Sequence, residues 1–176
     1  MFTNPNIMKK IISILAIISL FTLTSCGTQQ QKERPITYLP YSGAWFDIEY
    51  PADFIIRERE KSPTGSGYDG VVFREQNGDV EFYVYSPQWS GTSEFETQLE
   101  NEELLEETTQ EDFGKTVTFI KLHDIDDNYY REYKVFEENE GTVRYLYGFK
   151  YKTEKLHTKY LDAYNHFANT LVQYAD

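Results

Sequence analysis

Apolar and polar residues alternate along much of the chain, and this period of two predicts antiparallel strands. The clearest case runs from Val143 to Tyr151, where every second residue is valine or aromatic. Between two other predicted strands stands Asn77-Gly78, a dipeptide that readily takes the positive φ angles of a tight hairpin turn. The predicted strands cover residues 45–50, 54–57, 70–74, 80–85, 116–122, 129–137 and 142–151.

Apolar residues spaced three or four apart predict a closing helix over residues 154–174. A second helix is predicted to begin at Ser93, because Ser93 and Glu96 have the spacing of a capping box. Together these elements predict an α+β fold, an antiparallel sheet of about six strands with helices packed on its faces. The apolar stripe of the closing helix consists of Leu156, Tyr160, Tyr164, Phe167, Leu171 and Tyr174.

The first 26 residues have the pattern of an export signal. Met8-Lys9-Lys10 is followed by an uncharged run, Ile11–Leu23, which is shorter than the roughly 20 residues that a membrane-spanning helix needs. Leu23-Thr24-Ser25-Cys26 then resembles the lipobox of bacterial lipoproteins, in which an aliphatic residue and two small residues precede an obligatory cysteine. The resemblance implies cleavage before Cys26 and attachment of diacylglycerol to its sulfur. The alternatives are an ordinary signal followed by a buried or free cysteine, and an uncleaved membrane helix.

These patterns divide the chain into three parts. Residues 1–26 are the predicted lipoprotein signal, residues 27–40 a flexible tether rich in Gln, Thr and Pro, and residues 41–176 a single globular domain. Either Met1 or Met8 can be the start of translation. We expect an exported protein that is anchored by lipid to the cell envelope. Where the cell has two membranes we expect the outer one, because Gly27 follows the cysteine and not the Asp that resembles an inner-membrane retention signal.

The composition narrows the possible partners. The chain has 29 acidic and 17 basic residues and a formal net charge of −12, which argues against nucleic-acid phosphate as a partner. A single cysteine excludes a disulfide framework and a cysteine-rich metal site. The 15 Tyr, 12 Phe and 2 Trp residues can supply one sizeable core.

Two acidic segments are candidate cation sites. Residues 94–112 contain nine acids and no base, but glutamates spaced along a helix spread their oxygens, so a solvated acidic face is expected. His123–Asn128 begins like a calcium-binding loop. Its sixth position is Tyr129 where Gly is needed and its twelfth is Val135 where Glu is needed, so a polar turn is expected.

Histidine and tryptophan provide the other candidates. His157 and His166 are nine residues apart on the closing helix and point in opposite directions, so both are expected at the surface or at the rim of the core. Trp89 lies in a predicted loop and is expected to close the end of the core; alternatively it stacks on a sugar or anchors a partner. No nucleophile elbow, zinc pair or phosphate loop occurs, so no catalytic, metal-binding or cofactor residue is predicted. A pair of acids for glycoside cleavage is the one catalytic possibility left open.

Several short motifs resemble proteins with the PsbP/Mog1-like fold. Phe46-Asp47-Ile48-Glu49-Tyr50-Pro51, followed by Phe54, resembles their opening strand. Asp69–Phe73, the Asn77-Gly78 hairpin, Tyr130–Tyr133 and the closing helix continue the resemblance. It implies an antiparallel sheet of about six strands with helices on both faces. It implies no particular activity, because members serve as photosystem subunits, as binders of a small GTPase and as bacterial lipoproteins of unknown role.

The sequence therefore predicts a membrane-tethered, non-catalytic exported domain that acts through contacts with an unidentified protein. The alternative is a module that binds a small molecule or glycan through loop aromatics near Trp89. A hydrolase is a third reading. The membrane, through the lipid anchor at Cys26, is the other expected partner, and no cofactor is expected.

Overall fold

The computed structural model describes residues 35–138 and 140–174. The chain divides into two compact units, Met1–Pro35 and Ile36–Asp176, and the elements below belong to the second. The predicted signal, Cys26 and the tether as far as residue 34 lie outside the described residues. Among the residues described, no helix has both the length and the apolar character needed to cross a membrane.

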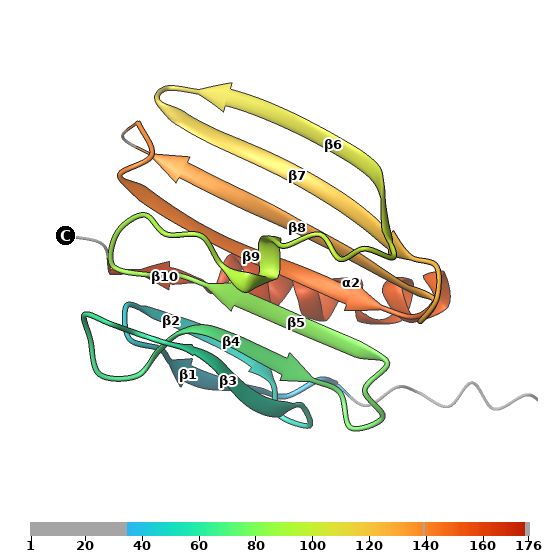
Figure 1. The fold of residues 1–176 in the computed structure, drawn as a ribbon. Helices are drawn as coiled ribbons and strands as arrows, with labels where there is room; N and C mark the ends of the chain where they lie inside the picture. Colours follow the sequence, from blue (N-terminus) through green and yellow to red (C-terminus); the bar gives the residue numbers. More distant parts are fainter. Residues whose placement is uncertain (1–34, 139, 175–176) are drawn as a thin grey trace, which may run out of the picture. The chain divides into compact units, whose positions relative to one another are not determined.

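A seven-stranded antiparallel sheet forms the frame of the domain, with strand order β3-β4-β5-β9-β8-β7-β6 (Figure 1). Strands that follow one another in sequence pair as hairpins, except where β5 pairs with β9 and joins the two halves of the sheet. The strands are β3 (Ile55–Lys61), β4 (Tyr68–Arg74), β5 (Val80–Tyr85), β6 (Glu102–Asp112), β7 (Lys115–Asp124), β8 (Tyr129–Glu138) and β9 (Val143–Tyr151).

One face of this sheet is covered by a helix and a second, smaller sheet. The helix is α2 (Glu154–Asn169), which lies behind the large sheet in Figure 1. The smaller sheet contains β1 (Tyr38–Ser42), β2 (Phe46–Pro51) and β10 (Val172–Gln173), in the order β1-β2-β10. The described residues thus show the α+β architecture that the sequence predicts.

The core beneath α2 consists largely of aromatic rings. Phe82 of β5 is fully buried, and its ring centre lies 5.1 Å from that of Phe149 and 5.4 Å from that of Phe167. Burial of one such side chain stabilises a fold by about 1.5–3 kcal/mol. The predicted helical stripe is confirmed at Tyr160, Tyr164 and Phe167, which are buried. The helix nevertheless ends at Asn169 rather than at residue 174, and the chain continues into β10.

The opposite face has its own core, which includes Tyr83, Leu122, Tyr133 and Leu146. The irregular connection over residues 86–101 covers this core. The sequence predicts that a helix begins at Ser93 in this connection. The capping box of Ser93 and Glu96 is present, but it begins only a 3-10 turn, η1 (Glu94–Glu96). The acidic residues after it form β6 instead, so α2 is the only α-helix among the described residues, and the helices expected on both faces are not seen.

The first strand begins inside the predicted tether. Tyr38 and Tyr41 of β1 are half-buried and pack against the core, so residues 38–40 belong to the domain. Pro40 is tolerated because β1 is an edge strand, where the N–H that proline lacks is not needed by a neighbour.

The Asn77-Gly78 turn is confirmed at its glycine. Gly78 has a φ of +79°, and its N–H donates to the carbonyl oxygen of Glu75 at 2.8 Å. Asn77 does not have the positive φ expected of it, because the connection between Arg74 and Val80 is longer than a two-residue turn.

Candidate functional site

The sheet face opposite α2 is organised around Arg131 of β8, which is 8% exposed. Its guanidinium donates to both carboxylate oxygens of Glu102, at 2.9 Å and 2.6 Å. It also donates to the carbonyl oxygens of Phe95 and Thr97, the latter at 3.1 Å. These bonds tie the connection 86–101 and the start of β6 to β8.

Glu102 stays ionised in this position because its hydrogen bonds outweigh the effect of burial. Burial opposes the charged form, but Arg131, the N–H of Leu99 and the hydroxyl of Tyr129 all donate to the carboxylate. The pKa of Glu102 therefore lies below its ordinary value. Burial and the Glu102 carboxylate raise the pKa of Tyr129, so its hydroxyl remains a donor. Glu102, Tyr129 and Arg131 therefore form a fixed hydrogen-bonded cluster beside a cleft.

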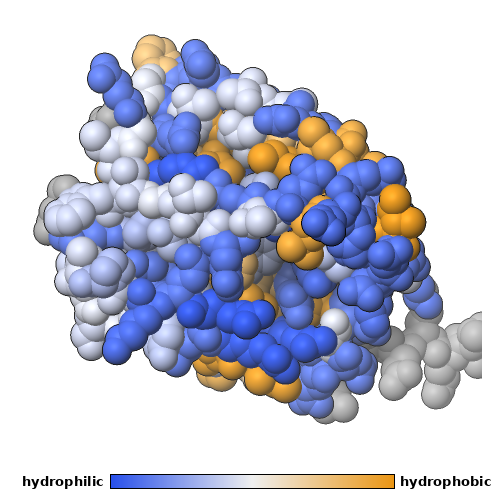
Figure 2. Space-filling view, viewed as in Figure 1, coloured by the Kyte–Doolittle hydropathy of each residue, from blue (hydrophilic) through white to orange (hydrophobic). Residues whose placement is uncertain are grey.

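That cleft has a volume of about 420 Å³ and is lined by both the connection and the sheet. Val72 and Tyr83 of the sheet line it together with Phe95 of the connection, whose ring centre lies 5.0 Å from that of Tyr83. Lys150 of β9 also lines it, with its ammonium nitrogen 3.7 Å from the centre of the Tyr129 ring. Figure 2 shows this side of the domain as largely hydrophilic, with hydrophobic residues in separate patches. The cleft therefore combines apolar walls with charged groups, as small-molecule sites do.

The free end of the β6–β7 hairpin is a second candidate. Its two-residue turn is Phe113-Gly114, with φ angles of +45° and +80°. Asn, Asp or Gly usually occupies such positions, because most side chains are strained at positive φ. The Phe113 side chain is also fully exposed, at 103% of its reference area. An apolar ring placed in solvent on a strained backbone has no role in the core.

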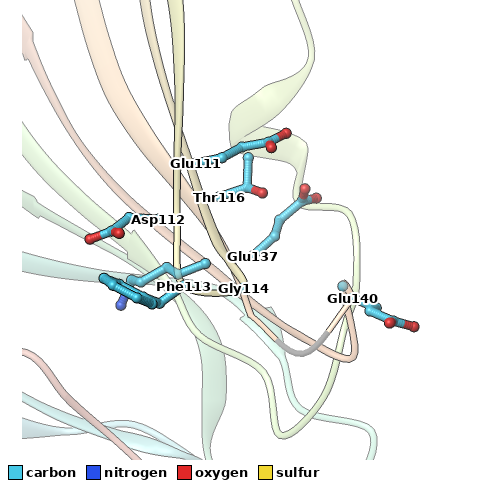
Figure 3. A pocket seen from close by; sticks show the side chains of 9 residues that line it. Glu111, Asp112, Phe113, Gly114, Thr116, Glu137 and Glu140 are labelled. Atoms are coloured by element: carbon cyan, nitrogen blue, oxygen red, sulfur yellow. The ribbon is translucent and has the colours of Figure 1, made fainter.

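A hollow of about 930 Å³ lies beside this turn and includes the tip of the β8–β9 hairpin. Figure 3 shows Glu111, Thr116 and Glu137 on one side of the strands, and Asp112 on the other. Lys115, the single base in the lining, pairs with Glu138 of β8. No group of acids, histidines or cysteines able to hold a metal ion occurs among the described residues. The lining residues are Glu111, Asp112, Phe113, Gly114, Lys115, Thr116, Glu137, Glu140 and Gly141.

The predicted acidic face exists, but on a strand. β6 is an edge of the large sheet, and all of its residues after Glu102 are exposed. The polar turn expected over 123–128 is shorter, because His123 and Asp124 still belong to β7 and only residues 125–128 connect it to β8. The Asp124 carboxylate accepts a hydrogen bond from the N–H of Asp127 at 2.7 Å.

The two histidines of α2 lie apart, as their spacing predicts. The Nε2 atom of His157 lies 3.2 Å from Glu132 of β8, and that of His166 lies 2.6 Å from Glu49 of β2. Both side chains are half-buried at the edge of the aromatic core, which agrees with a position at its rim.

The prediction that Trp89 closes the core is wrong, because its side chain is 55% exposed. Phe95 makes the aromatic contact between the connection and the sheet instead. Trp89 lines neither the cleft nor the hollow. The aromatic residues that could contact a ligand or partner there are Phe95 in the cleft and Phe113 in the hollow. The Phe-Gly dipeptide between two alternating segments is the sequence signal that could have identified Phe113.

Two acids, one buried and one half-buried, bear on the hydrolase reading. Burial raises the pKa of Glu60 on β3 and of Asp69 on β4. Glu60 accepts a hydrogen bond from the Ser93 hydroxyl at 2.5 Å, and Asp69 is only 3% exposed. The Glu60 carboxylate is thus occupied by a residue of the connection.

Comparison with solved structures identifies the architecture as the PsbP/Mog1-like fold. The solution structure of cyanobacterial PsbP (CyanoP) from Synechocystis is similar with a TM-score of 0.50 and 15% identity, covering 86% of this chain and 99% of that chain. The crystal structure of the Ran-binding protein Mog1p from Saccharomyces cerevisiae gives a TM-score of 0.46 and 10% identity, covering 80% of this chain and 97% of that one. At these identities the likeness concerns the fold alone. No protein-family model matches the chain, and no curated protein matches its sequence.

Proposed function

We propose that this protein is an exported lipoprotein whose domain binds another protein through the free end of the β6–β7 hairpin. The export signal and the lipobox ending at Cys26 support the first part. The observation that carries the second is Phe113, an aromatic side chain held fully in solvent at a position of positive φ. Strained residues persist where the surrounding structure or a function requires them.

Physical considerations favour a protein as the partner. Burying one phenylalanine ring contributes about 1.5–3 kcal/mol, which makes Phe113 suitable as an anchor. The acids around it set the sign of the complementary surface, because Glu111, Asp112 and Glu140 make no ion pair with other described residues. The partner is thus expected to present an apolar pocket bordered by basic side chains.

Site-specific photo-cross-linking in intact cells tests the interface. A photoreactive residue replaces Phe113 in one strain and Ile125 in another. Ile125 is a matched control because it is an apolar residue with 62% exposure that follows β7 at the opposite end of the strand. We expect one adduct of defined mass from position 113 and little from position 125. Equal adducts at both positions, or none at position 113, would contradict the proposed interface.

Metabolic labelling tests the anchor separately. A fatty-acid probe should label the wild-type chain and should not label Cys26→Ser. Equal labelling of the two would show that Cys26 is not the lipid site, without affecting the result at Phe113.

A further inference from the structure

We infer that the cleft of about 420 Å³ beneath the connection 86–101 binds a small molecule that has one carboxylate group and an apolar body. The carboxylate binds at Lys150, and the apolar body lies against Phe95 and Tyr83. This site is independent of the hairpin end and of the proposed protein contact.

The first observation is the environment of Lys150. Six of the described Lys and Arg residues form no ion pair with other described residues. Five of these six are exposed, and the sixth is Lys150. Lys150 alone is half-buried, and its ammonium nitrogen lies over the face of the Tyr129 ring. In a chain with 29 acids and 17 bases, an unpaired ammonium in a cleft is unexpected on composition alone. The exposed members of this group are Arg57, Lys61, Lys134, Lys155 and Lys159.

The second observation is that the carboxylates lining the cleft are already paired. Glu81 lies opposite Lys150 in the register of β5 and β9, but its carboxylate is 3.1 Å from Arg74. Glu102 is held by Arg131, and Glu94 lies 3.9 Å from Arg59. Each acid of the cleft therefore has its own base, and the charge of Lys150 is left over.

Two further acids lie nearby, in an adjoining cavity of about 280 Å³ that Lys150 also lines. Asp79 is paired with Lys152 at 2.7 Å, and Asp127 has an exposed side chain. Solvent screens a charge in that position more strongly than one inside the cleft. It therefore offsets the charge of Lys150 less than a carboxylate bound in the cleft would.

The shape and lining of the cleft define the rest of the ligand. Its volume lies within the range of about 300–1,000 Å³ typical of small-molecule sites. The tilted rings of Phe95 and Tyr83 and the side chains of Val72 and Leu99 offer an apolar surface. A single free ammonium suits a monoanion better than a di- or triphosphate, which requires several cations.

The test compares 3-phenylpropionate with the neutral 3-phenylpropanamide, which has the same apolar body. Saturation-transfer difference NMR on the full chain in detergent micelles, with empty micelles as the blank, gives both affinities. We expect the carboxylate to bind about tenfold or more tightly than the amide, since a hydrogen bond between two charged groups is stronger than one to a neutral group. Equal affinities, or no protein-dependent signal from either probe at about 10 mM, would overturn the proposal.

Variants locate the site. Lys150→Met keeps the aliphatic part of the side chain and removes its charge, so it should weaken binding of the carboxylate about tenfold and leave the amide unchanged. Phe95→Ala should weaken both probes. Lys155→Met is the matched control, because Lys155 is also unpaired but exposed on α2, and it should change neither. Unchanged carboxylate affinity in Lys150→Met would overturn the assignment. If that variant does not fold, the comparison of the two probes on the wild-type chain decides.

Discussion

Two parts of the same sheet differ in what covers them. Around β5 and β9, alternate side chains point into one core beneath α2 and another beneath the connection 86–101, and Phe82, Phe149 and Leu146 are fully buried. At β6 and the hairpin tip, side chains extend into solvent on both faces of the sheet. Strand formation is common to both parts, but only the first gains stability from burial.

The two parts therefore have different roles. The covered part stabilises the fold, and close packing limits which side chains it can accept. The hairpin end is kept in place by its pairing with β8, so its outward residues can change without cost to the core. Substitutions in the two parts should therefore have opposite effects on stability and on binding.

The largest expected effect is in the covered part. Phe167→Ala removes a fully buried ring of α2 that packs against Phe73 and Phe82, at 5.5 Å and 5.4 Å between centres. It should lower the free energy of unfolding by about 3–5 kcal/mol. Asn165→Ala, on the exposed side of the same helix, should change it little. Denaturant titration measures both; equal small effects would show that α2 is not the main cover of the sheet.

The next effect concerns the ion pair that supports the cleft. Because the pKa of Glu102 is lowered in the fold, its contribution to stability is present above the ordinary value of 4.5 and is lost as the pH falls through the lower folded value. Glu102→Gln should cost about 1.5–3 kcal/mol at neutral pH, and its difference from wild type should shrink in acid. Glu107→Gln, at an exposed position of β6, is the control. A constant difference from pH 7 to pH 3, measured by chemical unfolding, would refute this account of Glu102.

A smaller effect is expected at the β4–β5 turn. Gly78→Val places a β-branched residue at a φ of +79° and should cost about 1–3 kcal/mol. Gln76→Val, in the same turn at a negative φ, is the comparison. Thermal melting of the two variants checks this, and indistinguishable midpoints would show that positive φ at Gly78 is not required.

The smallest effect on stability is expected at the hairpin tip. Phe113→Ser removes no buried contact, so the free energy of unfolding should change by less than about 0.5 kcal/mol. Capture of the partner by a cross-linker placed at Glu140, beside it in the hollow, should nevertheless be lost. A large loss of stability, or undiminished capture, would contradict the assignment of stability to the covered part and of binding to the hairpin end.

The sequence was sufficient where local pattern and tertiary packing agree. β9 alternates without a break and is central, so it was predicted correctly. α2 carries its stripe at helical spacing, so it was predicted correctly except for its end, which lies at Asn169. β6 was missed because glutamate and leucine favour helices locally, and the capping box at Ser93 pointed the same way. Pairing with β7 over ten residue pairs overrides that preference, and no local pattern reports such a contact.

The candidate sites follow the same rule. The cleft was not predicted, because its side chains come from six strands, β3, β4, β5, β6, β8 and β9, and from the connection, and only the fold makes these neighbours. Phe113 was overlooked because the helix prediction placed it after an acidic run instead of at the tip of a hairpin. The prediction for Cys26 depends on a short contiguous motif and needs no fold.

The acidic edge of β6 also has a consequence for self-assembly. An open strand of eleven residues offers free N–H and C=O groups to a second copy, which is the usual start of edge-to-edge polymerisation. Along this edge, pairing of two β6 strands would bring Glu106, Glu107 and Glu111 of each copy close together. Repulsion between these like charges opposes such pairing. The acidic side chains of β6 therefore protect an open edge of the sheet against polymerisation.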